Sequence, residues 1–251
     1  MIQPIRLIVS DIDGCLGPGE AKPYDLDVLR RVAECNLRAK RGEDTPAVTL
    51  CSGRSAAYVD AMMQAVAGFV PAIFENGAGL YFPESYRFAW NPALSASTRA
   101  TIRRARELLE ERVVQAGLAR IQPGKEMAVT LFPSPGHCLD EVGDVTKATL
   151  EREGLTCRVD VSVSSVGIWP DGIDKGAGVR WLAEEIGIPL TEMAGVTDTW
   201  DDLPLLRQVG FRAAPANADR EVTQIADYVS PYQDGRGLID IIERILERKA
   251  D

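Results

Sequence analysis

The chain has 251 residues, enough for one large domain or two small ones with a sizeable core. Its hydrophobic content of 45% and charged content of 26% are ordinary for a globular protein, and its net charge of −9 argues against a nucleic-acid or broad membrane-binding surface. No apolar run approaches the length of a membrane span, and the N-terminus lacks the pattern of a signal peptide.

The first predicted strand ends at two carboxylates. A short apolar run, residues 7–10 (LIVS), is followed by Asp11 and Asp13 and then by glycine. Further on, we expect a helix starting after Asp25, strands at 47–51 and 72–74 with a helix between them, and a short strand through Phe82. This alternation of strand and helix predicts a parallel sheet with right-handed crossovers.

The pattern changes near residue 83. A long charged helix is expected from Thr98 to about Val114, and later segments predict a strand, a second helix and a hairpin, at 127–132, 139–153, and 157–162 with 166–169. We therefore predict a small α+β domain over residues 83–169, the segment that the family resemblance described below implies to be a cap. It would be inserted into a core made of residues 1–82 and 170–251.

The parallel pattern resumes after residue 170. A helix is expected from about residue 175, and a short buried strand at 193–196 runs into 197–202 (TDTWDD). A strand at 211–214 and two helices complete the chain, and the last helix places Leu238, Ile241 and Ile245 on one face. The predicted fold class is α/β, with a Rossmann-like doubly wound parallel sheet.

Acidic residues follow two of these core strands. Asp11, Asp13, Asp198, Asp201 and Asp202 would gather up to five carboxylates where the strands end, since the carboxyl ends of parallel strands meet at one edge. Their mutual repulsion calls for a cation. The chain has one histidine and no C-x-x-C pair, so the ligands are oxygens and the expected metal is Mg²⁺. The alternative is an acidic turn without function.

Two further stretches suit an anion. Ser52 and Gly53 stand where a strand gives way to a helix, so their hydroxyl and backbone N–H groups can receive a phosphate. Lys175 opens a later helix; alone it is explained as a solvated surface lysine, but beside the carboxylates it suits a phosphate clamp. Together the residues predict metal-assisted chemistry on a phosphate.

These motifs, taken in order, resemble the haloacid dehalogenase-like (HAD) superfamily. The matching stretches are 11–16 (DIDGCL), 52–54 (SGR), Lys175 and the Asp-x-x-x-Asp of 198–202. Residues 75–77 (ENG), 174–176 (DKG) and 215–218 (PANA) resemble the Cof-type branch, whose neighbourhood includes archaeal phosphoglycolate phosphatases and sucrose-phosphate phosphatases. The resemblance implies a Mg²⁺-dependent phosphatase acting on a small phosphorylated metabolite, with a cap that selects the substrate.

The resemblance also implies a role for each acidic residue. Asp11 would be the nucleophile that forms an aspartyl-phosphate, and Asp13 would be the general acid and base. Mg²⁺ would be held by the Asp11 carboxylate, the Asp13 backbone carbonyl and Asp198, with Asp202 close by.

The remaining motif residues are implied to hold the phosphoryl group. Ser52, the Gly53 backbone and Lys175 would bind its oxygens, with Ser52 and Lys175 counted among the catalytic residues. Arg54 and Asn217 are further candidates for phosphate binding.

Two residues depart from the family pattern. Thr197 replaces a small residue beside the metal ligand, and Asp201 replaces a neutral amide. Three alternatives therefore stay open beside the phosphatase: a phosphomutase or phosphotransferase, a catalytically weak protein that binds a phosphorylated ligand, and a receiver-type domain. The cysteines are typical of a reducing cytoplasm, and the sequence does not give the oligomeric state.

Overall fold

The computed structural model describes residues 4–248, which fall into two compact units. One comprises the described parts of 1–89 and 174–251, and the other comprises 90–173. The expected α/β class is confirmed, because a parallel sheet forms the centre of the first unit. The assignment of residues 83–169 to a cap domain and of 1–82 and 170–251 to a catalytic core stays a prediction.

A five-stranded parallel sheet runs through the described part of the first unit, in the order β12-β11-β10-β1-β2. Its strands are β1 (Leu7–Ser10), β2 (Ala47–Leu50), β10 (Met193–Val196), β11 (Phe211–Ala214) and β12 (Tyr228–Val229). β1 is paired on both sides and all four of its residues are buried, as its apolar run of Leu7, Ile8 and Val9 predicts. Ser10 pairs with Val196 and with Leu50, so the chain segments that leave these three strands start side by side.

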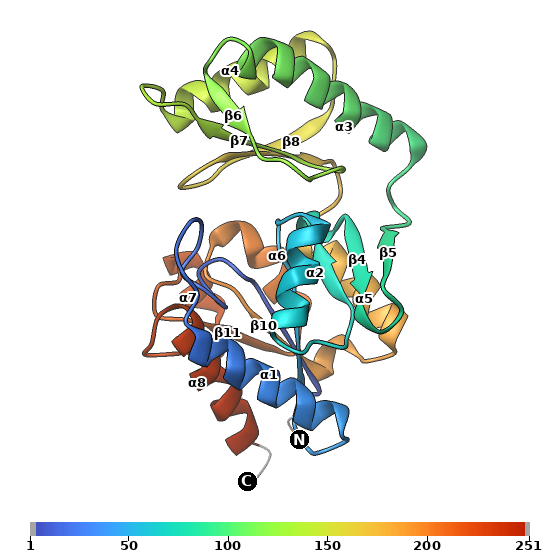
Figure 1. Ribbon diagram of the computed structural model, residues 1–251, viewed down its shortest axis with the longest axis vertical. Coiled ribbons are helices and arrows are strands. Elements are labelled where there is room, and N and C mark those ends of the chain that lie inside the picture. Colours follow the sequence, from blue (N-terminus) through green and yellow to red (C-terminus); the bar gives the residue numbers. More distant parts are fainter. Residues whose placement is uncertain (1–3, 249–251) are drawn as a thin grey trace. The chain divides into compact units, whose positions relative to one another are not determined.

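Helices pack around this sheet. They are α1 (Leu26–Lys40), α2 (Ala56–Ala65), α5 (Lys175–Ile186), α6 (Leu203–Leu206), α7 (Arg220–Ile225) and α8 (Asp234–Glu247). α1 and α8 lie side by side (Figure 1), and Arg31 forms an ion pair with Glu243 between them. Leu238, Ile241 and Ile245 are buried, which confirms the apolar face expected for the last helix.

The third predicted strand joins a small sheet of its own. β3 (Ala72–Phe74), β4 (Gly79–Phe82) and β5 (Arg87–Trp90) are neighbours in that order, and β3 pairs with β4 in antiparallel orientation. A single parallel bridge, Cys51 to Ile73, links β3 to the chain that leaves β2. The parallel sheet expected from the sequence therefore gives way to an antiparallel extension at this point.

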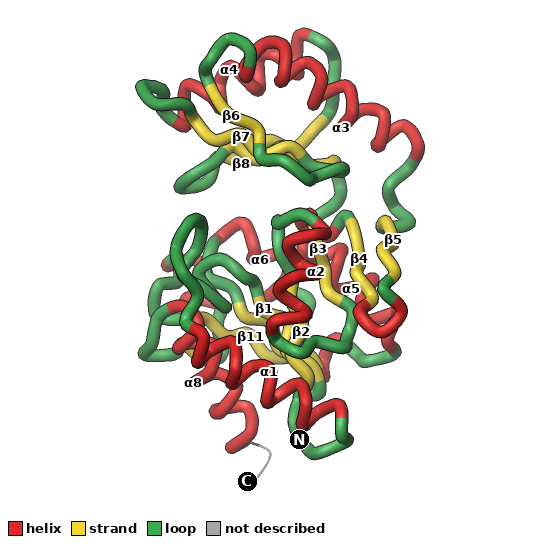
Figure 2. Tube along the Cα trace, in the orientation of Figure 1, coloured by secondary structure: helices red, strands yellow, loops and turns green. Residues whose placement is uncertain are grey.

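The second unit has an antiparallel sheet with helices on one face. Its strands, in spatial order, are β6 (Ala119–Ile121), β7 (Val129–Pro133), β9 (Val166–Pro170) and β8 (Cys157–Val161). α3 (Ala96–Leu109) and α4 (Leu139–Arg152) both cover the same face of this sheet (Figures 1 and 2). The expected hairpin is β8 with β9.

None of the helices within residues 4–248 combines the length and the apolar character needed to cross a membrane.

Candidate active site

Three neighbouring strands deliver the candidate residues to one edge of the parallel sheet. Asp11 follows β1 directly, Ser52 lies two residues after β2, and Asp198 lies two residues after β10. The backbone N–H of Asp11 donates to the Val196 carbonyl at 2.9 Å, so the segments that leave β1 and β10 stay joined beyond the strands. This is the edge at which open α/β sheets bind their ligands.

Three carboxylates converge there. Asp11, Asp198 and Asp202 each place one oxygen within 4.8 Å of the others. Asp202 ends the short 3-10 turn Trp200–Asp202 that leads into α6. The sequence predicted up to five carboxylates near one point, but the side chains of Asp13 and Asp201 are not part of this group. The Asp13 carboxylate is bound by Arg54 instead.

Lys175 lies within the carboxylate group. It is the first residue of α5, a helix that is capped by the Asp174 side chain, which accepts the Ala177 N–H at 2.7 Å. The Lys175 ammonium lies 3.0 Å from Asp11 Oδ1 and 2.7 Å from Asp202, and its side chain is 5% exposed. Burial opposes the positive charge, but Asp11 and Asp202 outweigh burial and hold the pKa of Lys175 well above its ordinary value.

The cluster carries more negative charge than one lysine offsets. Burial, and then the charge of Asp11, raises the pKa of Asp198 to about 7. A group of oxygen ligands short of positive charge fits a hard divalent cation, and the residues present therefore suit Mg²⁺.

This charge imbalance predicts a pH-dependent stability. Asp198 has a pKa of about 7 when folded, against an ordinary value of 3.8. Between these values the folded protein keeps a proton that the unfolded chain has lost, so in the metal-free protein the free energy of unfolding should fall as the pH rises through this window. Thermal melting with and without Mg²⁺ measures this, and Mg²⁺ should stabilise more at about pH 8 than at about pH 5.

The variant Asp198→Asn is the control, because it removes the titrating group. Its melting temperature without metal should lack the part of the pH dependence that the wild type shows between about pH 4 and about pH 7. Identical pH profiles for the two proteins would contradict this account of the cluster.

The Asp13 side chain lies outside the carboxylate group and binds Arg54. The Arg54 guanidinium forks onto its carboxylate, with Nε 2.7 Å from Oδ2 and Nη2 2.6 Å from Oδ1. Two parallel hydrogen bonds of this kind fix both the distance and the plane of the carboxylate. Arg54 was predicted to bind phosphate, and in this structure its guanidinium is engaged by Asp13.

The loop of Ser52 and Arg54 is held by the turn that follows β3. The Glu75 N–H donates to the Arg54 carbonyl at 2.9 Å, and the Asn76 N–H donates to the Ser52 carbonyl at 3.0 Å. Ser52 is buried, and its hydroxyl oxygen accepts the Arg54 N–H at 3.2 Å. Gly53 lies between these anchored residues, so the loop is preorganised, as an anion-binding turn requires.

Asn217 and Gly14 support Asp198. The Asn217 amide donates to the Gly14 carbonyl at 2.9 Å and to Asp198 Oδ2 at 3.3 Å, and its oxygen accepts the Asp234 N–H at 2.8 Å. Asn217 was predicted to bind phosphate, and here it holds the Asp198 carboxylate. Gly14 has a φ of +77°, and a Cβ there would lie 1.9 Å from Asp198 Oδ2. Sequence reasoning gave Gly14 no role, although the motif at 11–16 contains it.

Thr197, one of the two departures from the family pattern, and Cys15 lie next to these groups. Thr197 is fully buried, and its hydroxyl has no hydrogen-bond partner among the described residues. Cys15 is fully buried beside Asp198, with Sγ 3.8 Å from Oδ1. Burial, and then the charge of Asp198, raises the pKa of Cys15 well above its ordinary value, so the thiol is unsuited to nucleophilic chemistry.

Comparison with known proteins points to one family. The haloacid dehalogenase-like hydrolase family model matches residues 144–242, a segment that holds Lys175, Asp198, Asp202 and Asn217. A phosphoglycolate phosphatase of Methanopyrus kandleri is 28% identical over 251 aligned residues, covering 96% of this chain and 97% of the relative.

Solved structures share the fold along the whole chain. A protein of Thermoplasma acidophilum superposes with a TM-score of 0.75 at 20% identity, covering 97% of this chain and 99% of that one. The sucrose-phosphatase of Synechocystis, solved with sucrose and phosphate, gives a TM-score of 0.68 at 16% identity, covering 97% and 98%. The resemblance predicted from the motifs is confirmed: the chain is similar in sequence to haloacid dehalogenase-like hydrolases and shares the fold of the solved structures.

Proposed function

We propose that this protein is a Mg²⁺-dependent phosphatase that hydrolyses a small phosphorylated metabolite through a phosphoryl group carried on Asp11. The observation that carries the proposal is the arrangement of Lys175 with Asp11, Asp198 and Asp202. Three carboxylates beside one lysine leave an excess of negative charge that one divalent cation offsets. The cation and the lysine would then face the phosphoryl group with positive charge.

The metal would be held by the carboxylates of Asp11 and Asp198 and by the Asp13 backbone carbonyl, with Asp202 close by. When bound, Mg²⁺ neutralises negative charge on the phosphoryl oxygens and on the carboxylates around them. Lys175 would bind one phosphoryl oxygen, since its ammonium already lies 3.0 Å from the attacking carboxylate.

The reaction proceeds in two steps at phosphorus. In the first, an Asp11 oxygen bonds to phosphorus while the bond to the substrate oxygen breaks, and Asp13 donates a proton to that leaving oxygen. In the second, Asp13 takes a proton from water as the water oxygen bonds to phosphorus, and the bond to Asp11 breaks. Phosphate and the free alcohol are the products, and both aspartates return to their starting state.

Ser52 and Gly53 complete the phosphate site in this proposal. Their hydroxyl and backbone N–H groups would bind the phosphoryl oxygens that Lys175 leaves free. The hydrogen bonds from the Glu75–Gly77 turn hold the loop in place before substrate arrives, which limits the reorganisation needed during the reaction.

The substrate class rests on the relatives. The Methanopyrus kandleri relative is a phosphoglycolate phosphatase, so 2-phosphoglycolate and small sugar phosphates are the substrates to test first. The described cysteines are all free thiols, which supports a reducing compartment such as the cytoplasm as the place of action.

A phosphate-release assay on a panel of such metabolites tests the proposal. With Mg²⁺ we expect release of inorganic phosphate and the matching alcohol in equal amounts, and with EDTA we expect none. Binding of these compounds without any release would support the alternative of a phospho-ligand-binding protein. Phosphate that appears on an added acceptor alcohol instead would support a phosphotransferase.

A further inference from the structure

We infer that Tyr58, with Tyr24 as its partner, is a positioning residue that holds Arg54 against Asp13. This inference rests on the proposed function, in which Asp13 moves the protons. Neither tyrosine belongs to a motif of the family resemblance, and both lie in the first unit, Tyr24 before α1 and Tyr58 in the first turn of α2.

The contacts run from Asp13 through Arg54 and the two tyrosines and back to the segment that carries Asp13. Arg54 forks onto Asp13, and the Arg54 guanidinium carbon lies 4.8 Å from the centre of the Tyr58 ring. The Tyr58 hydroxyl lies 2.7 Å from the Tyr24 hydroxyl. The Tyr24 ring then packs on Gly17, where a Cβ would lie 2.3 Å from Tyr24 Cε1.

Gly17 connects this series of contacts back to Asp13. The turn between them is tight, because the Gly14 N–H donates to the Gly17 carbonyl at 2.7 Å and the Gly17 N–H donates to the Ile12 carbonyl at 2.9 Å. Tyr24 can lie against this turn only because Gly17 has no side chain. The same short segment is therefore held from one side through Arg54 and from the other through Tyr24.

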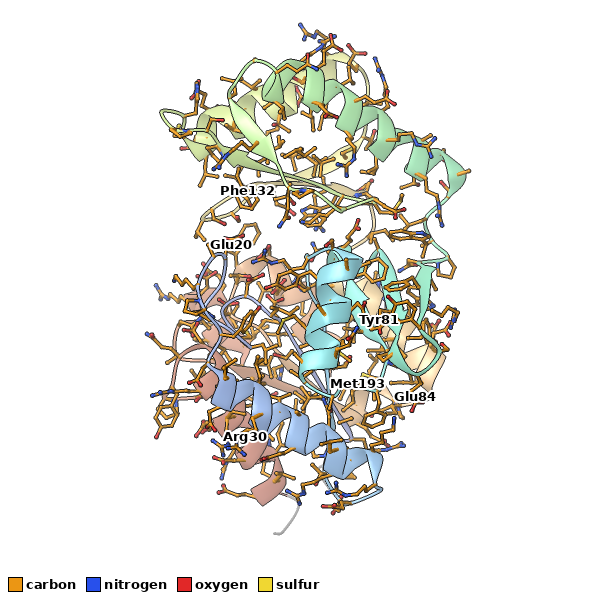
Figure 3. The ribbon with its side chains drawn as sticks, viewed as in Figure 1. Glu20, Arg30, Tyr81, Glu84, Phe132 and Met193 are labelled. Carbon is orange, nitrogen blue, oxygen red and sulfur yellow. The ribbon has the colours of Figure 1, made fainter. Side chains whose placement is uncertain are left out.

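The hydrogen bonds from Arg54 hold a side chain that is partly exposed. Asp13 is 32% exposed, whereas Arg54 is 14% exposed. Glu20, at the tip of the same β1–α1 loop that carries Tyr24 (Figure 3), is a further acidic group whose charge acts on Arg54. Stacking on Tyr58 favours the guanidinium orientation that faces Asp13, since a cation is attracted to the face of an aromatic ring.

This geometry gives Tyr58 a role that differs from general support of the fold. A general acid must stand within hydrogen-bond reach of the leaving oxygen, and a small displacement weakens proton transfer. Loss of Tyr58 should therefore slow reactions that need a protonated leaving group and spare those that do not. An alkoxide leaves poorly without a proton, whereas p-nitrophenolate leaves readily without one.

The experiment compares two substrates in single turnover, with enzyme in excess over 2-phosphoglycolate or p-nitrophenyl phosphate. For Tyr58→Leu we expect the rate of phosphoryl transfer from the alkyl ester to fall about 10-fold more than the rate from the aryl ester. Tyr228→Leu is the matched control, because Tyr228 also lies beneath an arginine, Arg244, and bonds a carboxylate through its hydroxyl. The control should change neither rate.

A double-mutant cycle tests the tyrosine pair without removing either ring. Tyr24→Phe and Tyr58→Phe should each lower the alkyl-to-aryl rate ratio by about 3-fold, and the double variant should lose no more than one single variant, because both break the same hydrogen bond. Thermal melting verifies that each variant is folded. If Tyr58→Leu does not fold, the Tyr24→Phe and Tyr58→Phe variants still test the inference.

Equal losses on both esters, or losses that multiply in the double variant, would overturn the inference. A wild-type protein that releases no phosphate from either ester would instead overturn the proposed function, and the inference with it. The two failures are therefore distinguishable from the wild-type rate alone.

Discussion

Asp11→Asn should abolish phosphate release, with turnover falling by roughly 10⁴-fold or more, a size of loss known for removal of an enzymic nucleophile. The two side chains have almost the same shape, but the amide cannot form the acyl-phosphate. Asp11 is also buried beside Asp198 and Asp202, so removing its charge relieves repulsion and the variant should fold. The measurement is the rate of phosphate release with Mg²⁺, together with a thermal melt.

Asp27→Asn is the matched control for this substitution. Asp27 lies in the first turn of α1 and pairs with Arg30 on the surface, so the same chemical change there should leave turnover unaltered. Residual turnover in Asp11→Asn comparable to that of Asp27→Asn would show that Asp11 is not the nucleophile.

Lys175→Met is expected to have the largest effect on stability. Methionine fills a similar volume but leaves Asp11 and Asp202 buried without their cation, and removal of one partner from a buried ion pair lowers the free energy of unfolding by about 3–5 kcal/mol. Phosphate release should fall at least about 100-fold, because a preorganised charge aimed at the phosphoryl group is lost. Urea unfolding without metal and the phosphate-release assay measure the two effects.

Lys40→Met provides the comparison. Lys40 also pairs with a carboxylate, Glu84 at 3.0 Å, but both side chains are more than half exposed. Exposed pairs of this kind contribute about 0–1 kcal/mol, so this variant should stay close to the wild type in stability and activity. If the two lysine variants unfold at the same urea concentration, the buried cluster does not depend on Lys175.

The sequence predicts the parts of the fold that repeat a clear pattern. The apolar run that ends at Asp11 is a fully buried strand, and the stripe of Leu238, Ile241 and Ile245 is the buried face of α8. The meeting of Asp11 with Asp198 also follows from sequence, because parallel strands end at a common edge and β1 lies beside β10. The first two predictions depend on local patterning, and the third depends on the general geometry of parallel sheets.

Strands that are too short to show an alternation of apolar and polar residues are not predicted from the sequence. β6 has three residues and β12 has two, so neither shows an alternation that could be read. The charged helix predicted as continuous from Thr98 to Val114 changes from an α-helix to a π-helix near its end. Its α-helix stops at Leu109, and a π-turn follows in which the Gln115 N–H donates to the Glu110 carbonyl at 3.0 Å.

The side-chain partners in the site could not be predicted from the sequence. Asp13 and Arg54 are 41 residues apart, and nothing local indicates that the arginine takes the carboxylate away from the cluster. Tyr24 and Tyr58 are 34 residues apart and lie in unremarkable sequence. Such contacts are set by tertiary packing, which decides the direction of a side chain once the backbone has placed it.

Mass spectrometry can look directly for a phosphoryl group on Asp11. Wild-type protein would be mixed with Mg²⁺ and p-nitrophenyl phosphate, quenched in acid within the first turnovers, digested and analysed by mass spectrometry. We expect one phosphoryl group on the peptide that contains Asp11, and none in the Asp11→Asn variant. Phosphorylation at another residue, or steady phosphate release with no phosphorylated peptide at any quench time, would contradict this expectation.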